Sequence, residues 1–368
     1  MSRPSLVQSV TTFFSERFPR EKLNYHDLVE KKTVPEHQMS WAYFLGGLAL
    51  FFFVIQVLTG LLLLLYYKPT VSDAHASVHY LTEYVPNGAL IRNMHAWSAS
   101  FMIFFVLAHF LTALAMKAFG RPREITWIAG VLLLFLTFTF GFTGYLLPWS
   151  EISVNATKVV MQSIEEVGQY LPAALAEMPV AMRNAIQGEA SVGQATLSRF
   201  FAIHVLVLPL IFAMLLGLHL LSIQLHGMSQ GVDKPTGRSV RFFPTFMLRD
   251  LRVWMAALLV LYLVALTVPF ESFLPATLLQ PFNPLGSTPA GIKPEWYFFP
   301  MYYPMEMLPF WVILLSMTGL SGGLFLVPWL FRGAARKTLG ALAVVAALYL
   351  VVMTLFGQHI YELVKGGK

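Results

Sequence analysis

Long apolar tracts without a single Asp, Glu, Lys or Arg dominate the hydrophobic pattern of this chain, and the shorter segments between them carry most of the charge. About 20 apolar residues cross the hydrocarbon core of a bilayer as a helix, so each tract predicts one membrane span. We therefore expect an all-α, polytopic membrane protein with seven transmembrane helices. The tracts are residues 41–67, 94–116, 125–150, 200–232, 253–270, 307–331 and 338–361.

Basic residues gather in alternate segments between these tracts, at residues 17–32, 117–123, 234–252 and 332–337. The other loops, such as 150–198 and 270–306, are rich in proline, sparsely basic and carry most of the acids. The positive-inside rule then places the N-terminus in the cytoplasm or its equivalent and the C-terminus on the opposite side. We call these the n side and the p side. The first 40 residues are too charged, and too interrupted by proline, for a signal peptide.

Composition narrows the chemistry. The chain of 368 residues is 57% hydrophobic and 12% charged, far from the balance of a water-soluble domain. It has no cysteine, which excludes disulfides, Cys-ligated zinc, iron–sulfur clusters and haem attached through C-x-x-C-H. The net charge of +6 follows the membrane topology, so we expect lipid contact and no nucleic-acid partner.

The chain divides into blocks. Residues 1–40 form an n-side segment, residues 41–232 contain the first four spans, and residues 233–368 contain the last three, with a polar joint at 225–249. A short amphipathic helix is expected at 159–170, followed by an irregular stretch rich in Pro, Ala and Gly. A second Pro-rich loop, 275–300, separates spans five and six.

Four histidines lie inside two spans. His95 and His109 are 14 residues apart in span two, and His204 and His219 are 15 apart in span four. At 100° per residue these spacings fall within about 40° and 60° of whole turns, so each helix presents two imidazoles on roughly one face, about 21 Å apart. Antiparallel packing would pair His95 with His204 and His109 with His219, which predicts two cofactor sites stacked across the membrane.

Haem iron is the favoured metal, since it needs two axial imidazoles per site, whereas two histidines leave tetrahedral zinc short of ligands. The alternative is four separate polar residues, each satisfied by a neighbouring helix, but matched spacing on two spans argues against it. Glycine pairs in spans one and three, also 14 residues apart, would give a macrocycle room. They are Gly46 with Gly60 and Gly130 with Gly144.

Two arginines at the p-side ends of these helices are candidate partners for haem propionates. Arg92 lies three residues before His95, and Arg199 lies five before His204. The alternative is that both side chains extend to the lipid–water interface without binding a cofactor.

Several motifs resemble the cytochrome b family of bc-type quinol oxidoreductases, over residues 34–357. They include "IRNMHAWSAS", "GFTGYLLPW", "SVGQATLSRFFAIH" and "PEWYFFP". The span-four spacing and the seven spans resemble the plastid-type branch, with its two polypeptides fused here. Phe44 occupies the position where that branch attaches an extra haem covalently, so no covalent haem is expected. Gln224 stands where relatives often have a basic residue.

The resemblance implies a diheme four-helix bundle with two non-covalent b-type haems. It implies quinol oxidation on the p side, electron transfer through the haems to an n-side quinone site, and proton translocation. The implied partners are a Rieske iron–sulfur protein, a c-type cytochrome subunit or soluble cytochrome c, and the quinone pool. A homodimeric complex in the bacterial cell membrane, or an equivalent energy-transducing membrane, is expected.

Site residues follow from the same resemblance. Glu295 is expected to accept a proton from quinol, in a pocket formed by Pro294, Trp296 and Tyr297, with Tyr302 as a hydrogen-bonding phenol. Its alternative role is to cap backbone N–H groups where the loop enters span six. On the n side Asp250 is the expected proton relay, with His226 and Arg249 as helpers; alternatively Asp250 pairs with Arg249 or Arg252.

Two other functions would fit part of this pattern. A transporter would explain seven spans and intramembrane histidines, but not matched histidine and glycine ladders. A diheme membrane anchor, passing electrons between a soluble dehydrogenase and quinone, would share the haems but has no need of the p-side loop that carries Glu295.

Overall fold

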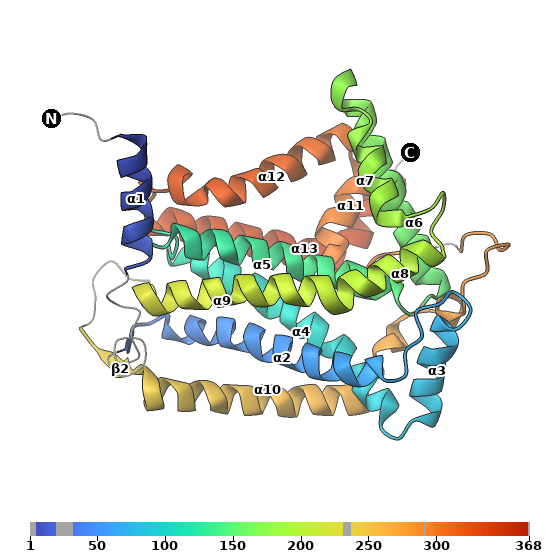
Figure 1. Ribbon diagram of the computed structural model, residues 1–368, viewed down its shortest axis with the longest axis horizontal. Coiled ribbons are helices and arrows are strands. Elements are labelled where there is room, and N and C mark those ends of the chain that lie inside the picture. Colours follow the sequence, from blue (N-terminus) through green and yellow to red (C-terminus); the bar gives the residue numbers. More distant parts are fainter. Residues whose placement is uncertain (1–4, 20–31, 231–236, 290, 367–368) are drawn as a thin grey trace.

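The computed structural model describes residues 5–19, 32–230, 237–289 and 291–366. Within them, seven helices are long and apolar enough to cross a membrane, which confirms the predicted all-α, seven-span fold (Figure 1). The basic residues Arg20, Lys22, Lys31 and Lys234, and the expected domain boundary at 232/233, lie outside the described residues. The spans are Ser40–Leu64, Gly88–Ala115, Glu124–Leu146, Gln194–His226, Phe242–Thr267, Phe310–Leu330 and Arg336–Gly366.

Helices make up most of the described secondary structure, with two short strands. The helices of the first half are α1 (Leu6–Arg17), α2 (Tyr43–Leu64), α3 (Ala74–Tyr84), α4 (Gly88–Ala115), α5 (Glu124–Leu146), α6 (Glu151–Glu166) and α7 (Met178–Gln187). Those of the second half are α8 (Gln194–Ala202), α9 (Leu208–His226), α10 (Met247–Thr267), α11 (Phe299–Met307), α12 (Phe310–Leu330) and α13 (Arg336–Gly366). The strands β1 (Thr33–Pro35) and β2 (Ser239–Arg241) pair antiparallel.

Most spans differ at their ends from the charge-free tracts. Span two begins at Gly88 rather than residue 94, and span five already begins at Phe242 and contains Asp250 and Arg252. Charged side chains are tolerated at helix ends because they reach the interface while the backbone stays helical. The expected amphipathic helix is longer than predicted, as α6, and the stretch expected to be irregular contains α7.

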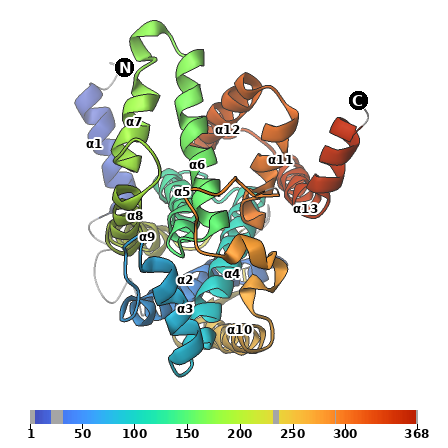
Figure 2. The same cartoon turned by 90° about the vertical axis from the view of Figure 1, so that its right-hand side faces the viewer.

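Four spans form a bundle, and the other three pack around it. Helix α2 packs against α4, α5 against α9, and α4 against α5. Helix α10 covers α2 and α4, α13 lies against α4, and α12 contacts α5 (Figures 1 and 2). Helix α4 is thus surrounded by other spans, whereas span four packs mainly against α5 and leaves its outer side chains, such as Leu210 and Met214, exposed.

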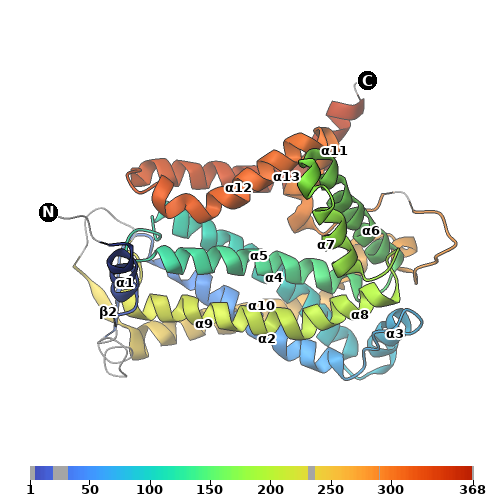
Figure 3. The same ribbon diagram turned by 45° about the horizontal axis from the view of Figure 1, so that its top comes forward.

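The two ends of the bundle differ. Helix α1 lies across one end, together with β2, whereas α3, α6 and α7 lie at the other (Figures 1 and 3). We call these the α1 end and the α6 end. The last turns of α13 reach the α6 end, as expected for seven crossings. The basic loops after α4 and α12 lie at the α1 end, which is the predicted n side.

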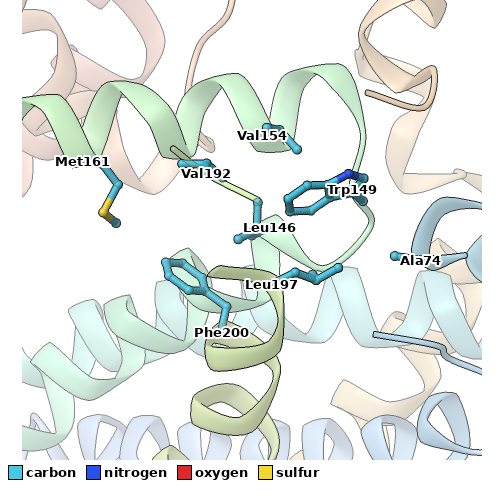
Figure 4. Packing of buried hydrophobic residues seen from close by; sticks show 8 residues of the cluster. All are labelled: Ala74, Leu146, Trp149, Val154, Met161, Val192, Leu197 and Phe200. Atoms are coloured by element: carbon cyan, nitrogen blue, oxygen red, sulfur yellow. The ribbon is translucent and has the colours of Figure 1, made fainter. Parts of the chain in front are cut away.

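A compact apolar cluster closes the α6 end. Side chains from α3, α5, α6 and α8 meet there, with Leu146 and Leu197 fully buried (Figure 4). Trp149, in the turn after α5, packs beside them at a positive φ of 52°. Packing of this kind fixes the end of α5, and therefore Gly144, against the start of span four.

Candidate functional site

The four intramembrane histidines form two facing pairs, as the spacing predicted. The ring centroids of His109 and His219 are 6.4 Å apart, with the planes 83° apart. Metal–imidazole nitrogen bonds are about 2 Å long, so two rings on opposite sides of one iron have centroids about 6 Å apart. His95 and His204 are close enough to interact electrostatically. In both pairs one histidine comes from α4 and the other from span four.

Each histidine lies against one of the predicted glycines. A Cβ on Gly46 would lie 3.1 Å from Cε1 of His109, and one on Gly60 3.4 Å from Cε1 of His95. The glycines of α5 face the other two rings in the same way: the distances are 3.2 Å from Gly130 to His219 and 2.7 Å from Gly144 to His204. The glycines thus make room for the imidazoles themselves, and the residues fit two bis-histidine haem sites.

Hydrogen bonds fix three of the rings. The Nδ1 atom of His95 lies 2.9 Å from Oγ1 of Thr59, and Nδ1 of His204 lies 3.1 Å from Oγ1 of Thr143. Nδ1 of His219 lies 2.9 Å from the carbonyl oxygen of Thr126. With Nδ1 engaged, Nε2 is the nitrogen left to bind a metal. Sequence reasoning missed these threonines, although Thr59 and Thr143 each directly precede a predicted glycine.

A π-helical turn, Ile203–Val207, contains His204 and connects α8 to α9. A π turn holds more residues than an α turn, and such turns occur often at functional sites. It accounts for the spacing of 15 residues in span four against 14 in α4. Both histidines of span four therefore face α4 despite the extra residue.

An aromatic and aliphatic layer separates the two histidine pairs. Phe52 and Met102 are buried at the middle of α2 and α4, and Phe212 is buried near the middle of span four. Phe53 stacks on Phe212 with a centroid distance of 4.3 Å. Among the described residues no group of three or more His, Asp or Glu could hold a metal ion.

The two candidate propionate arginines are engaged with protein groups. Arg92 forms a bidentate ion pair with Glu271, in the loop after α10. Arg199 donates to the backbone carbonyls of Asn184 and Ala185 in α7. Both arginines lie at the α6 end, as expected, and their role toward a haem stays a prediction.

The segment from Pro294 to Tyr297 packs against the four-helix bundle at the α6 end. Trp296 Nε1 donates to Ser100 Oγ of α4 at 3.4 Å. Tyr297 is buried, and a Cβ on Gly141 would lie 2.7 Å from its hydroxyl oxygen. The loop is therefore seated on α4 and α5 at the level of His95 and His204.

Glu295 is partly buried in this seat, and burial raises the pKa of its carboxyl to about 7. Its charge also interacts with the hydroxyls of Tyr145 and Tyr297. Tyr145 was missed from the sequence, although it follows Gly144 in the motif "GFTGYLLPW". Three titratable groups thus meet at one place, and a carboxylate with this pKa can accept a proton near neutral pH.

Tyr302 lies further along, in α11. Its ring packs on Tyr303 with centroids 5.2 Å apart. Burial, and then the charge of Glu306, raise the pKa of Tyr302 to about 12. Its described contacts do not include Glu295, so its part in the same site stays a prediction.

Asp250 lies at the α1 end, between α10 and α2. A Cβ on Gly47 would come within 2.6 Å of its Oδ1, so the carboxyl group fits only against a glycine. Oδ1 is buried and lies near the indole of Trp254, but neither Oδ1 nor Nε1 of Trp254 makes a hydrogen bond of good geometry among the described residues. Arg249 pairs instead with Glu36 at 2.7 Å, and Arg252 donates to the carbonyl of Leu248. The ion pair weighed as the alternative for Asp250 is absent from the described residues.

Two other polar residues of the α1 end, His226 and Lys32, contact other parts of the chain. His226 Nε2 lies 3.0 Å from the carbonyl oxygen of Arg17. Lys32 is buried, donates to Gln224 and lies over the ring of Phe242. Burial lowers the pKa of this amine to about 8. Lys32 was missed as a candidate because its segment gives no periodic signal.

Phe44, at the position where no covalent haem is expected, packs against other aromatic side chains. The ring of Phe44 stacks on Phe246 with centroids 5.3 Å apart and planes 6° apart. Phe242 stacks on the same ring, at 6.0 Å. These aromatic rings lie between Lys32 and Asp250 along the start of span five, and they form an apolar wall at the α1 end.

Comparisons with known proteins agree with this geometry. The family described as Cytochrome b/b6/petB matches residues 29–227, and the family described as Cytochrome b(C-terminal)/b6/petD matches residues 281–362. A cytochrome bc complex cytochrome b subunit of Chlorobaculum thiosulfatiphilum is 38% identical over 346 residues, covering 91% of this chain and 76% of that protein. Cytochrome b6 of Mastigocladus laminosus is 40% identical over 223 residues, covering 61% of this chain and 99% of that protein.

A solved structure described as a hyperthermophilic respiratory Complex III has the same fold, with a TM-score of 0.71 and 27% identity. The similarity covers 96% of this chain and 97% of that chain. Two family regions that the resemblance assigned to separate plastid-type polypeptides thus occur here in one chain. With its seven spans, its two facing histidine pairs and these matches, the chain belongs to the cytochrome b family of bc-type complexes.

Proposed function

We propose that this cytochrome b chain holds two non-covalent b-type haems and oxidises quinol at the α6 end while reducing quinone at the α1 end. The observation that carries the proposal is the pair of facing imidazoles at each of two depths, every ring backed by a glycine. When bound, the haems supply one-electron redox centres at those two depths. Membership of a bc-type family favours this function over a transporter or a diheme anchor.

The chain's own groups prepare the iron sites. Thr59, Thr143 and the carbonyl of Thr126 hold the Nδ1 atoms and so fix the tautomer of three histidines. A fixed tautomer directs Nε2 toward the metal and raises the basicity of the ligand. The buried layer around Phe52 and Phe212 excludes water between the two sites.

At the α6 end Glu295 would take one of the two protons that quinol releases on oxidation. Its pKa of about 7 leaves a large fraction of the carboxyl ionised at neutral pH. The carboxylate can therefore accept a proton from a quinol hydroxyl and afterwards release it to water. The hydroxyls of Tyr145 and Tyr297, which interact with the charge of Glu295, would help to orient the bound ring. Trp296 fixes the loop through Ser100.

At the α1 end Asp250 would deliver a proton to reduced quinone. A buried carboxyl oxygen without a partner is costly unless a ligand supplies one, and a quinone carbonyl is suitable when the carboxyl is protonated. The stacked rings of Phe44 and Phe246 give such a ligand an apolar wall.

The family implies the partners: a Rieske iron–sulfur protein and a c-type cytochrome, since the chain has no cysteine for either centre. We propose a homodimeric complex in a bacterial cell membrane or its equivalent. The α1 end would face the cytoplasm, because the basic loops lie there.

Haem content of the purified complex tests the proposal. His204→Leu is expected to remove one b-type haem and His219→Leu the other, each leaving one haem per chain. His359→Leu, at an exposed position of α13, is the matched control and should retain both. Folded wild-type complex without b-type haem, or two haems in either of the first two variants, would overturn it.

A further inference from the structure

Helix α11 connects the Glu295 segment to span six, and it lies against the second half of α13 (Figures 1 and 2). It follows directly on the short helical turn Trp296–Phe298, and the backbone N–H of Phe298 donates to the carbonyl oxygen of Glu295 at 2.9 Å. A single hydrogen-bonded turn thus separates Glu295 from α11. A displacement of α11 is therefore transmitted to the Glu295 pocket.

One face of α13 forms the contact with α11. Tyr349, Met353 and Gly357 recur every four residues, so they lie on the same side of the helix. The hydroxyl of Tyr349 donates to the carbonyl oxygen of Pro300 at 2.5 Å, and Met353 is buried. This face is therefore directed toward α11 and reaches its first turn.

Gly357 lies directly against the ring of Tyr303. A Cβ on Gly357 would be 2.1 Å from Cδ2 and 2.5 Å from Cε2 of that ring. Tyr303 is 3% exposed, and the rings of Phe299 and Tyr302 in the same helix pack on it with centroids 5.2 Å away in both cases. The ring has no free space into which to turn, so α11 approaches α13 this closely only because residue 357 has no side chain.

The other end of the segment is fixed independently of α13. Trp296 donates to Ser100 of α4, and the ring of Tyr297 packs on Phe138 of α5 with centroids 6.2 Å apart. Helix α13 itself lies against α4. Residues 295–303 are thus held by α4 and α5 at one end and by α13 at the other, and both anchors determine where Glu295 lies.

We propose that Gly357 is a positioning residue for quinol oxidation: by seating Tyr303 it sets the place of α11, and with it the positions of Glu295 and Tyr302 relative to the quinol ring. This inference rests on the proposed function of the Glu295 site. Ordinary carbon contacts are about 3.5–4.0 Å, so a methyl group at 357 would displace the Tyr303 ring by roughly 1.5 Å. A misplacement of about 1 Å at a reacting group costs up to roughly 100-fold in rate.

The test measures the oxidation of duroquinol by the purified complex, with cytochrome c as the electron acceptor. Gly357→Ala should lower kcat/KM for duroquinol roughly 10- to 100-fold. Gly340→Ala, in the same helix, is the matched control and should leave kcat/KM unchanged, because its Cβ would meet no heavy atom of the described residues within 4 Å.

A double-mutant cycle tests whether the effect passes through Tyr303. Tyr303→Ala removes the ring that the new methyl group would meet. In a Tyr303→Ala background, Gly357→Ala should therefore have no further effect on kcat/KM. Tyr349→Phe probes the same helix contact with little change of volume, in case Gly357→Ala does not assemble. Loss of its hydroxyl should lower kcat/KM roughly 2- to 10-fold.

Two further measurements separate positioning from a general loss of structure. Haem per chain and n-side haem reoxidation by quinone should stay at the wild-type level in Gly357→Ala. The rise in rate with pH through about 7 should persist, since Glu295 is intact. A residue that only stabilises the fold would lower haem content and both quinone reactions together.

The outcomes distinguish this inference from the proposed function. Equal kcat/KM in Gly357→Ala and Gly340→Ala, the same loss from Gly357→Ala with and without the Tyr303 ring, a parallel loss of n-side reoxidation, or an unchanged rate in Tyr349→Phe would each overturn this inference alone. A wild-type complex that holds haem but does not oxidise duroquinol would overturn the proposed function of the Glu295 site, and this inference with it.

Discussion

Gly144 gives the sharpest test of the haem sites. In Gly144→Ala the new Cβ would lie 2.7 Å from Cε1 of His204, whereas ordinary carbon contacts are about 3.5–4.0 Å. The ring cannot withdraw easily, because Thr143 of the same helix holds its Nδ1. Overpacking of this kind costs about 1–3 kcal/mol, which corresponds to roughly 5- to 150-fold weaker retention of the cofactor.

Gly60→Ala is the matched control, since Gly60 of α2 faces His95, the histidine that pairs with His204. Its Cβ would lie 3.4 Å from the imidazole, which is a tolerable contact. Haem per chain, measured from redox difference spectra of the purified complex, should fall toward one for Gly144→Ala and stay at two for Gly60→Ala. Equal haem loss in both variants, or loss of the haem held by His109 and His219, would refute the steric reasoning.

Four further predictions concern proton transfer, the pH dependence of stability and the anchoring of α1. In Glu295→Gln, quinol oxidation should slow at least ten-fold, while the haem spectra should not change. The rise in rate with pH through about 7 should disappear in this variant, because that rise reflects loss of the Glu295 proton. The same raised pKa means that the folded state keeps a proton that the unfolded state releases, so unfolding experiments should show stability falling from about pH 4.5 to 7 in wild type and less so in the variant. In Asp250→Asn, haem reoxidation by quinone should slow, with Arg252→Gln as a control, and an unchanged rate and pH dependence would return Asp250 to a structural role. Glu124→Gln leaves the buried Arg17 with only the partly exposed Glu16 as charge partner and should cost about 3 kcal/mol, the lower end of the range for breaking a buried pair. The loss should be seen as a lower thermal transition and faster proteolysis at α1; equal behaviour of Glu165→Gln, in an exposed pair with Arg183, would contradict this.

Much of the fold was predictable because its signal is local. The tracts without charged residues predicted the seven spans. The spacing of the histidines and glycines predicted which helix faces contact one another. Helix ends were less predictable, as at Phe242, because interfacial charges do not terminate a helix.

The supporting groups of the site were the least predictable part. Thr59 and Tyr145 act through side chains on other helices, and Glu271 meets Arg92 from 179 positions away in sequence. Lys32 reaches Gln224 across 192 positions. Such pairs depend on how whole helices pack, and no periodicity along the chain records them.

The π turn at Ile203–Val207 bears on how this span could have arisen. One residue inserted into a regular α-helix rotates everything beyond it by 100°, which would turn His219 away from α4. Confining the surplus residue to a single wide turn leaves the remainder of α9 in its old orientation. A length change within a transmembrane ligand helix can thus be inherited without loss of the downstream ligand, and deletion of one residue in this turn should convert the span to the 14-residue spacing of α4 with both histidines still facing their partners.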